Sequence, residues 1–159
     1  MIRFEILHFA DININMIRPI LTAFALLIFS ASNLSAHCQV PCGVYGDSAR
    51  FSQMLEDHST IAKAIGKISE LTGKKDAQSA NQLNRWVATK EEHASKIQKI
   101  IAEYFLTQRI KSSSNKYVAL LKGAHSVMVA AMKCKQGVDA KSADTLKSAI
   151  EDFQSAYEK

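Results

Sequence analysis

The chain has 159 residues, of which 47% are hydrophobic and 22% charged, a balance that is typical of a folded globular protein and excludes a largely disordered one. Lys and Arg outnumber Asp and Glu by 20 to 15, and the net charge of +5 would attract small anions or a nucleic acid. The basic residues do not cluster, so we expect solvated helix faces and no nucleic-acid partner. Examples of these singly spaced residues are Lys63, Lys67, Lys74, Lys90, Lys96 and Lys99.

Residues 1–36 have the pattern of a cleavable signal peptide. A basic start leads into the apolar run 20–29, which is short for a membrane span, and small residues follow up to Ala36. We expect cleavage after Ala36, with Met16 as a possible true start, because residues 16–36 form a complete signal on their own. An N-terminal membrane anchor is the alternative, and the small-residue end of the leader disfavours it. The leader holds two basic and two acidic residues, so its removal keeps the net charge at +5.

A run of metal-binding residue types follows the leader, from His37 to Tyr45. Cys38 and Cys42 are four positions apart, and in an exported protein that spacing by itself favours a disulfide. Half of a zinc site is a second interpretation, in which scattered histidines supply the other ligands.

Cleavage after Ala36 changes this ranking, because it gives His37 a free amine beside its imidazole. The amine, the deprotonated amide nitrogen of Cys38 and the thiolates of Cys38 and Cys42 can form a plane of two nitrogens and two sulfurs. That coordination suits nickel(II) or copper(II), whereas zinc prefers a tetrahedron. The imidazole of His37 remains available as an axial ligand. Such donors make one-electron redox cycling accessible.

Four later segments carry apolar residues at intervals of three and four, as amphipathic helices do. Their short connections favour an antiparallel four-helix bundle over residues 47–159, so the expected fold class is all-α. The modest core of such a bundle makes self-association a natural way to bury more surface. The first expected helix begins near Asp47 or Ser48 and ends at Thr72-Gly73. The second includes the apolar stripe from Leu83 to Ile110. The third includes Val118 to Met132 and ends at Gln136-Gly137, and the fourth includes Ala143 to Tyr157.

The run His37-Cys38-x-x-Pro41-Cys42-Gly43-x-Tyr45 closely resembles the N-terminal metal hook of nickel-containing superoxide dismutases. The resemblance continues over the whole mature chain and includes the segment 81–111. It implies a four-helix bundle assembled as a homohexamer, with one nickel ion per subunit in a hook of residues 37–46. It also implies the reaction 2 O2•− + 2 H+ → O2 + H2O2, driven by cycling between Ni(II) and Ni(III).

The resemblance assigns roles to individual residues of the hook. His37 supplies the amine and the axial imidazole, Cys38 its amide nitrogen and thiolate, and Cys42 its thiolate. Tyr45 matches the tyrosine beside the open face of the metal, where its hydroxyl can order water or substrate and help to deliver protons. Superoxide is then the small-molecule substrate.

The surroundings of the hook match the family less closely. In the family a glutamate early in the first helix and an arginine hold the axial imidazole. The spacing here leaves Ser52, Gln53 or Glu56 for the first role, and the arginine position falls near His93. Tyr104 matches a second tyrosine near the pocket, and a core aromatic is an equally good interpretation.

The remaining candidates have simpler interpretations. We expect His58 and His125 to be packed core or interface residues, Cys134 an unpaired structural thiol and Trp86 a core residue. Competing functions are a secreted binding or structural protein with a Cys38–Cys42 disulfide, and a nickel or copper carrier. The leader predicts an exported protein, periplasmic or secreted, without stable membrane anchoring after cleavage. The alternative is a cytoplasmic protein whose leader is a propeptide removed by a dedicated protease.

Overall fold

The computed structural model describes residues 46–159, and the regular secondary structure of this part is all helix, joined by short turns. Residues 1–45, which include the predicted signal peptide and the residues His37 to Tyr45, lie outside it. No helix among residues 46–159 combines the length and apolar character needed to cross a membrane. The helices are α2 (Asp47–Leu71), α3 (Ala77–Lys99), η1 (Ile100–Arg109), α4 (Tyr117–Gln136) and α5 (Ala140–Glu158).

The helix ends follow from local chemistry. Gly73 has a φ of 86°, a left-handed conformation that glycine adopts without a steric cost, and it ends α2 where the sequence predicts. Asp76 and Asp139 cap α3 and α5, each accepting a hydrogen bond from a backbone N–H in the first turn, at 2.8 and 2.9 Å. These local signals confirm the predicted segmentation into four helices.

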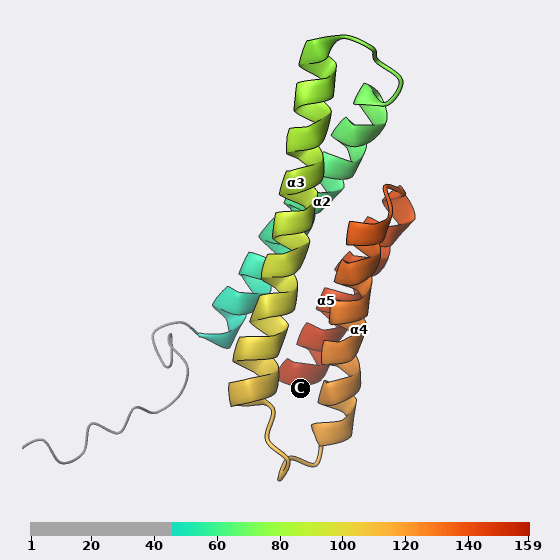
Figure 1. The fold of residues 1–159 in the computed structure, drawn as a ribbon. Helices are drawn as coiled ribbons and strands as arrows, with labels where there is room; N and C mark the ends of the chain where they lie inside the picture. Colours follow the sequence, from blue (N-terminus) through green and yellow to red (C-terminus); the bar gives the residue numbers. More distant parts are fainter. Residues whose placement is uncertain (1–45) are drawn as a thin grey trace, which may run out of the picture. The chain divides into compact units, whose positions relative to one another are not determined.

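Successive helices run in opposite directions, and η1 continues α3 without a break (Figure 1). α2 packs against α3 and α5, and α4 packs against the same two helices, so the four close into a bundle. This arrangement is the predicted antiparallel four-helix bundle. It brings the start of α2, the end of η1, the start of α4 and the end of α5 to one end of the bundle. We call this end the hook end, because Gly46 enters α2 there.

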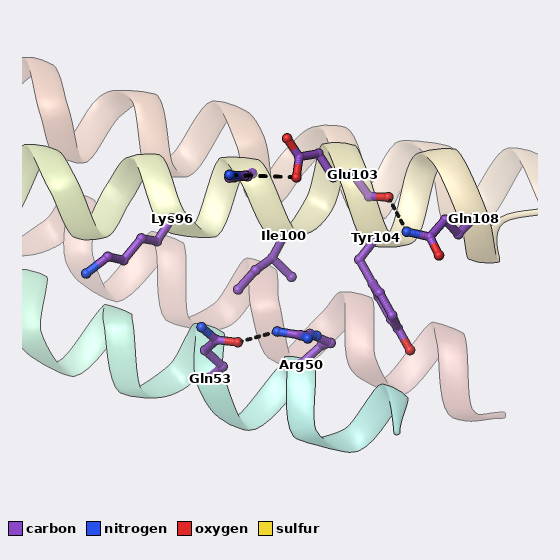
Figure 2. Close-up of a pocket in the computed structure, with 8 residues that line it drawn as sticks. Arg50, Gln53, Lys96, Ile100, Glu103, Tyr104 and Gln108 are labelled. Atoms are coloured by element: carbon purple, nitrogen blue, oxygen red, sulfur yellow. Dashed lines mark hydrogen bonds and ion pairs between the residues drawn. The ribbon is translucent and has the colours of Figure 1, made fainter. Parts of the chain in front are cut away.

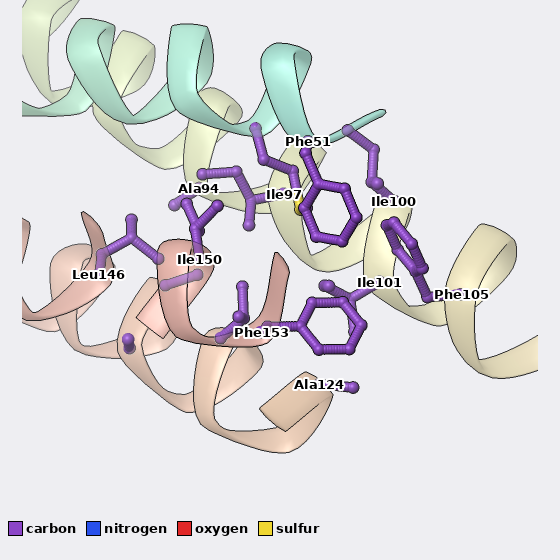
Figure 3. Close-up of a cluster of buried hydrophobic side chains, with 14 of the residues drawn as sticks. Phe51, Ala94, Ile97, Ile100, Ile101, Phe105, Ala124, Leu146, Ile150 and Phe153 are labelled. Carbon is purple, nitrogen blue, oxygen red and sulfur yellow. The ribbon is translucent and has the colours of Figure 1, made fainter. Parts of the chain in front are cut away.

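Aromatic rings fill the core at the hook end. Phe51, Phe105 and Phe153 are fully buried, with ring centroids 4.8 Å apart for Phe51–Phe105 and 5.0 Å for Phe105–Phe153 (Figure 3). These separations are typical of favourable aromatic pairs. Aliphatic side chains extend the core away from the rings, among them Ile97, Ile101, Leu146 and Ile150.

The ten residues of η1, which continue α3, form a π-helix, a wider helix in which hydrogen bonds join residues five apart. The backbone N–H of Ile110, for example, donates to the carbonyl of Phe105 at 2.9 Å. This widening accompanies two adjacent buried pairs, Ile100 with Ile101 and Tyr104 with Phe105. Tyr104 is thereby held at the edge of the core.

Two predicted stripes were wrong in part. In α4, Val118, His125 and Met132 are exposed. The buried face consists of Leu120, Ala124, Val127, Ala130, Ala131 and Cys134, of which the predicted stripe included Ala124 and Ala131. His125 is therefore not a core residue. α4 is rich in alanine and apolar around much of its circumference, so spacing alone does not single out one face.

The first half of α3 also differs from the expectation. No residue of α3 before Lys90 is buried, because this part of the helix packs chiefly on α2. Trp86 is half-buried, with the Lys63 ammonium 6.0 Å from its ring, and Val87 is 39% exposed. The prediction that Trp86 is a core residue was therefore wrong.

Lys90 overturns the expectation that the lysines are solvated. It is 2% exposed, and its ammonium donates to the carbonyls of Cys134, Lys135 and Gly137 at 2.5, 2.7 and 3.1 Å. A cation is favourable there, because the last carbonyls of a helix lack partners within the helix. Lys90 thus joins α3 to the C-terminal end of α4.

Candidate metal centre

The predicted ligands His37, Cys38 and Cys42, and the predicted catalytic residue Tyr45, lie outside the described residues, so their roles stay predictions. Residues 46–159 contain no group of three His, Cys, Asp or Glu side chains that could hold a metal ion. The described part of the chain therefore offers no competing metal site.

The cysteine and histidines inside the bundle have structural environments. His58 Nε2 donates to the carbonyl of Ala143 at 3.0 Å, and burial lowers the pKa of this imidazole. Cys134 is a buried free thiol, as predicted, and burial raises its pKa. A buried thiol with a raised pKa is a poor metal ligand. The donors that the sequence predicts for nickel, an amine, an amide nitrogen and two thiolates, belong to the hook, outside the described residues.

A pocket of about 300 Å³ opens between α2 and the α3–η1 rod at the hook end (Figure 2). Gln53, one of the three candidates for holding the axial imidazole, and Tyr104 both line it. Arg50 Nη1 donates to Gln53 Oε1 at 2.7 Å, and the Arg50 guanidinium lies 5.4 Å from the Tyr104 ring centroid. All three candidates are exposed on α2, and Ser52 and Glu56 do not line this pocket. The structure thus brings Gln53 and Tyr104 to one pocket.

His93, near which the arginine position was expected, pairs with Asp57 across α2 and α3. His93 Nδ1 donates to Asp57 Oδ1 at 2.6 Å. The other carboxylate oxygen, Asp57 Oδ2, is buried and has no hydrogen-bond partner among the described residues. Burial raises the pKa of Asp57, and the hydrogen bond from His93 opposes this only in part.

Asp47, the first residue of α2, collects three hydrogen bonds from the other elements at the hook end. The Tyr104 hydroxyl donates to Oδ1 at 2.5 Å, and the Tyr157 hydroxyl and Arg109 Nη2 donate to Oδ2 at 2.9 and 2.6 Å. We call these four residues the Asp47 clamp. Partial burial alone would raise the pKa of Asp47, but the hydrogen bonds from Arg109, Tyr104 and Tyr157 together lower it. Burial and the bond to Asp47 raise the pKa of Tyr104 to about 12.

The hydrogen bonds of the Asp47 clamp were not predicted from the sequence. The predicted helix start near Asp47 or Ser48 gives Asp47 a role within its own helix, whereas Gly46 is the N-cap and the Asp47 carboxylate binds donors across the bundle. A signal was present in the predicted topology. In an antiparallel bundle, the start of the first helix lies beside the ends of the second and fourth, which is where Arg109 and Tyr157 stand in the chain.

Asp47 and Asp57 are expected to make the stability of the fold depend on pH in opposite ways. The ionised Asp47 carboxylate stabilises the fold, and this contribution is lost as pH falls from about 3.8 through the lower pKa of the folded protein. Asp57 has a raised pKa, so its contribution is largest below about 3.8 and is lost as pH rises through its folded pKa.

We therefore expect opposite trends from Asp47→Asn and Asp57→Asn. As pH rises from about 3 to 7, the stability of the wild type relative to Asp47→Asn should increase, and relative to Asp57→Asn it should decrease. Urea unfolding of the three nickel-free proteins at each pH measures both differences. Trends of the same sign would contradict the assigned pKa directions.

A comparison of the sequence with protein-family models matches residues 32–159 to the nickel-containing superoxide dismutase family. The match covers most of the chain and includes both the hook sequence and the whole bundle. No curated protein and no solved structure was found to match the chain. The family model, the ligand run of the hook and the helical bundle agree, and the chain belongs to the nickel-containing superoxide dismutases, oxidoreductases that use a nickel cofactor.

Proposed function

We propose that the mature chain, beginning at His37, dismutates superoxide at a nickel ion held by the hook. The observation that carries this proposal is the donor run itself, in which one free amine, one amide nitrogen, two thiolates and one imidazole fall within six residues. Membership of the family supports the activity and the cofactor. His37, Cys38 and Cys42 hold one nickel ion per subunit.

The nickel ion supplies the one-electron chemistry, alternating between Ni(II) and Ni(III), and the protein supplies charge and protons. The net charge of +5 favours the approach of the superoxide anion. In this proposal the hydroxyl of Tyr45 would order water or substrate at the metal and help to deliver a proton. Tyr104, whose pKa is raised to about 12, keeps its phenolic proton at neutral pH and donates it to Asp47 in a hydrogen bond.

The location of the protein follows from its leader. Residues 1–36 have the composition of a signal peptide, and their removal creates the amine that the hook needs. We place the mature protein outside the cytoplasm, either periplasmic or secreted. Recovery of mature protein solely from the cytoplasmic fraction would favour a propeptide removed by a dedicated protease.

Self-association is the remaining part of the proposal. Val118, Met132 and Val138 are between 40% and 61% exposed in the described chain, so α4 and the turn after it carry uncovered apolar surface. A homohexamer, as the resemblance implies, would give these side chains a partner. Native mass spectrometry tests the assembly, and a monomer that is fully active would contradict it.

The experiment that tests the function replaces one sulfur ligand. Cys38→Ser in the mature protein should abolish nickel binding and dismutase activity, because an alcohol is a far weaker ligand for nickel than a thiolate. Cys134→Ser makes the same change at a buried thiol outside the hook and should keep both. Metal analysis and a dismutation assay on the two variants measure the outcome.

The same proteins separate the proposal from its competitors. A nickel or copper carrier would bind metal without turnover. A structural Cys38–Cys42 disulfide would leave no free thiol on either residue after nickel is removed anaerobically, so thiol titration distinguishes it. Nickel and activity retained in Cys38→Ser would overturn the proposed site.

A further inference from the structure

The Asp47 carboxylate has an unusual role for an acidic residue in the first turn of a helix. The N-cap residues Asp76 and Asp139 use their carboxylates to accept a hydrogen bond from a backbone N–H of their own helix, whereas Asp47 is one position inside α2, after the N-cap Gly46. The start of α2 has no side-chain cap hydrogen bond. The carboxylate instead accepts donors from η1 and α5, so it fixes the start of α2 relative to two other elements.

The start of α2 is also where the hook joins the bundle. Only four residues separate Cys42 from Asp47, and Tyr45 is two positions before Asp47. Five Cα–Cα steps join Cys42 to Asp47, and they span at most about 18 Å. The position of Asp47 therefore limits how far from the bundle the second thiolate and Tyr45 can lie.

The clamp also orients Tyr104. This side chain is 7% exposed, its ring packs edge-on against Phe105 at 5.2 Å between centroids, and the Arg109 guanidinium lies 5.8 Å from its ring centroid. With the ring held in this way, the bond to Asp47 Oδ1 sets the direction of the hydroxyl. One carboxylate thus holds both the base of the hook and the tyrosine of the nearby pocket.

We propose that Asp47 is a positioning residue for the metal centre, and that its bonds to Tyr104, Arg109 and Tyr157 hold the hook in its metal-binding arrangement. The inference rests on the proposed function, because it takes the hook as the nickel site. Asp47 does not touch the metal. It acts as an outer support, of the kind whose loss typically weakens metal binding or activity about 10- to 100-fold.

The test compares Asp47→Asn with Asp139→Asn, which makes the same chemical change at the start of α5, away from the clamp. In the mature protein, Asp47→Asn should weaken nickel binding about tenfold or more, measured by competition with a chelator. It should also broaden the electron paramagnetic resonance spectrum of the oxidised nickel protein. Asp139→Asn should leave the affinity and the spectrum unchanged.

A second variant guards against a simple folding defect. Tyr157→Phe removes one donor and keeps the ring, and we expect the same changes in affinity and spectrum at a smaller size. Wild-type affinity and spectrum in Asp47→Asn, with only a lower melting temperature, would show that the clamp is purely structural and would overturn the inference. Failure of the proposed function is distinguishable, because the wild-type protein would then bind no nickel, bind it without turnover, or keep it in Cys38→Ser.

Discussion

A mature chain extended by one residue before His37 is expected to lose both its nickel and its dismutase activity. The extension converts the amine of His37 into a peptide amide, whose nitrogen shares its lone pair with the carbonyl. The five-atom chelate of that amine with the amide nitrogen of Cys38 then cannot form as proposed. The loss of an outer-shell partner typically lowers metal affinity about 10- to 100-fold, so we expect the loss of a direct ligand to lower nickel affinity by about a hundredfold or more.

The matched control adds the same residue after Lys159, which leaves the hook unchanged. Metal content by elemental analysis and turnover in a dismutation assay should be unaffected in this control. Full activity of the protein extended before His37 would refute the amine ligand. It would leave the two thiolates as the supported part of the site.

Lys90→Met is expected to lower the free energy of unfolding by about 3 kcal/mol. Met fills a volume similar to that of Lys, so the loss reports the missing ammonium and not a cavity. Three carbonyls at the end of α4, those of Cys134, Lys135 and Gly137, would lose their common donor. For a chain of this size the change corresponds to a fall in melting temperature of about 10 °C.

Lys99→Met is the control for this prediction. The Lys99 side chain is 69% exposed, and its ammonium is 3.9 Å from Glu103, so the substitution should change stability by less than about 0.5 kcal/mol. Urea unfolding of both nickel-free variants gives the comparison. Equal stability of the two variants would show that the buried ammonium contributes nothing beyond its packing.

The predictable parts of the fold depend on signals that are local in the chain. Gly73 ends α2 because its positive φ suits glycine, and Asp139 begins α5 because its carboxylate caps the first turn. The segmentation into four helices, and from it the antiparallel bundle, follow from such signals and from apolar spacing.

The parts that the sequence did not predict depend on contacts between helices. Alanines on α4 suit either a buried or an exposed face, so the spacing that included Val118 did not select the buried side. Lys90 differs from the solvated lysines because its ammonium contacts the backbone carbonyls at the C-terminal end of α4, which is distant in the sequence. The direction of the Asp47 carboxylate likewise depends on η1 and α5, which follow it at a distance in the chain.

The central claim is that processing before His37 creates the nickel site. Expression of the full 159-residue chain, followed by intact-mass measurement and N-terminal sequencing of the nickel-bearing fraction, tests it directly. The account predicts active protein that begins at His37 with one nickel ion per chain, and an unprocessed fraction without nickel or activity. Active nickel-bearing protein that begins at any residue upstream of His37 would contradict it.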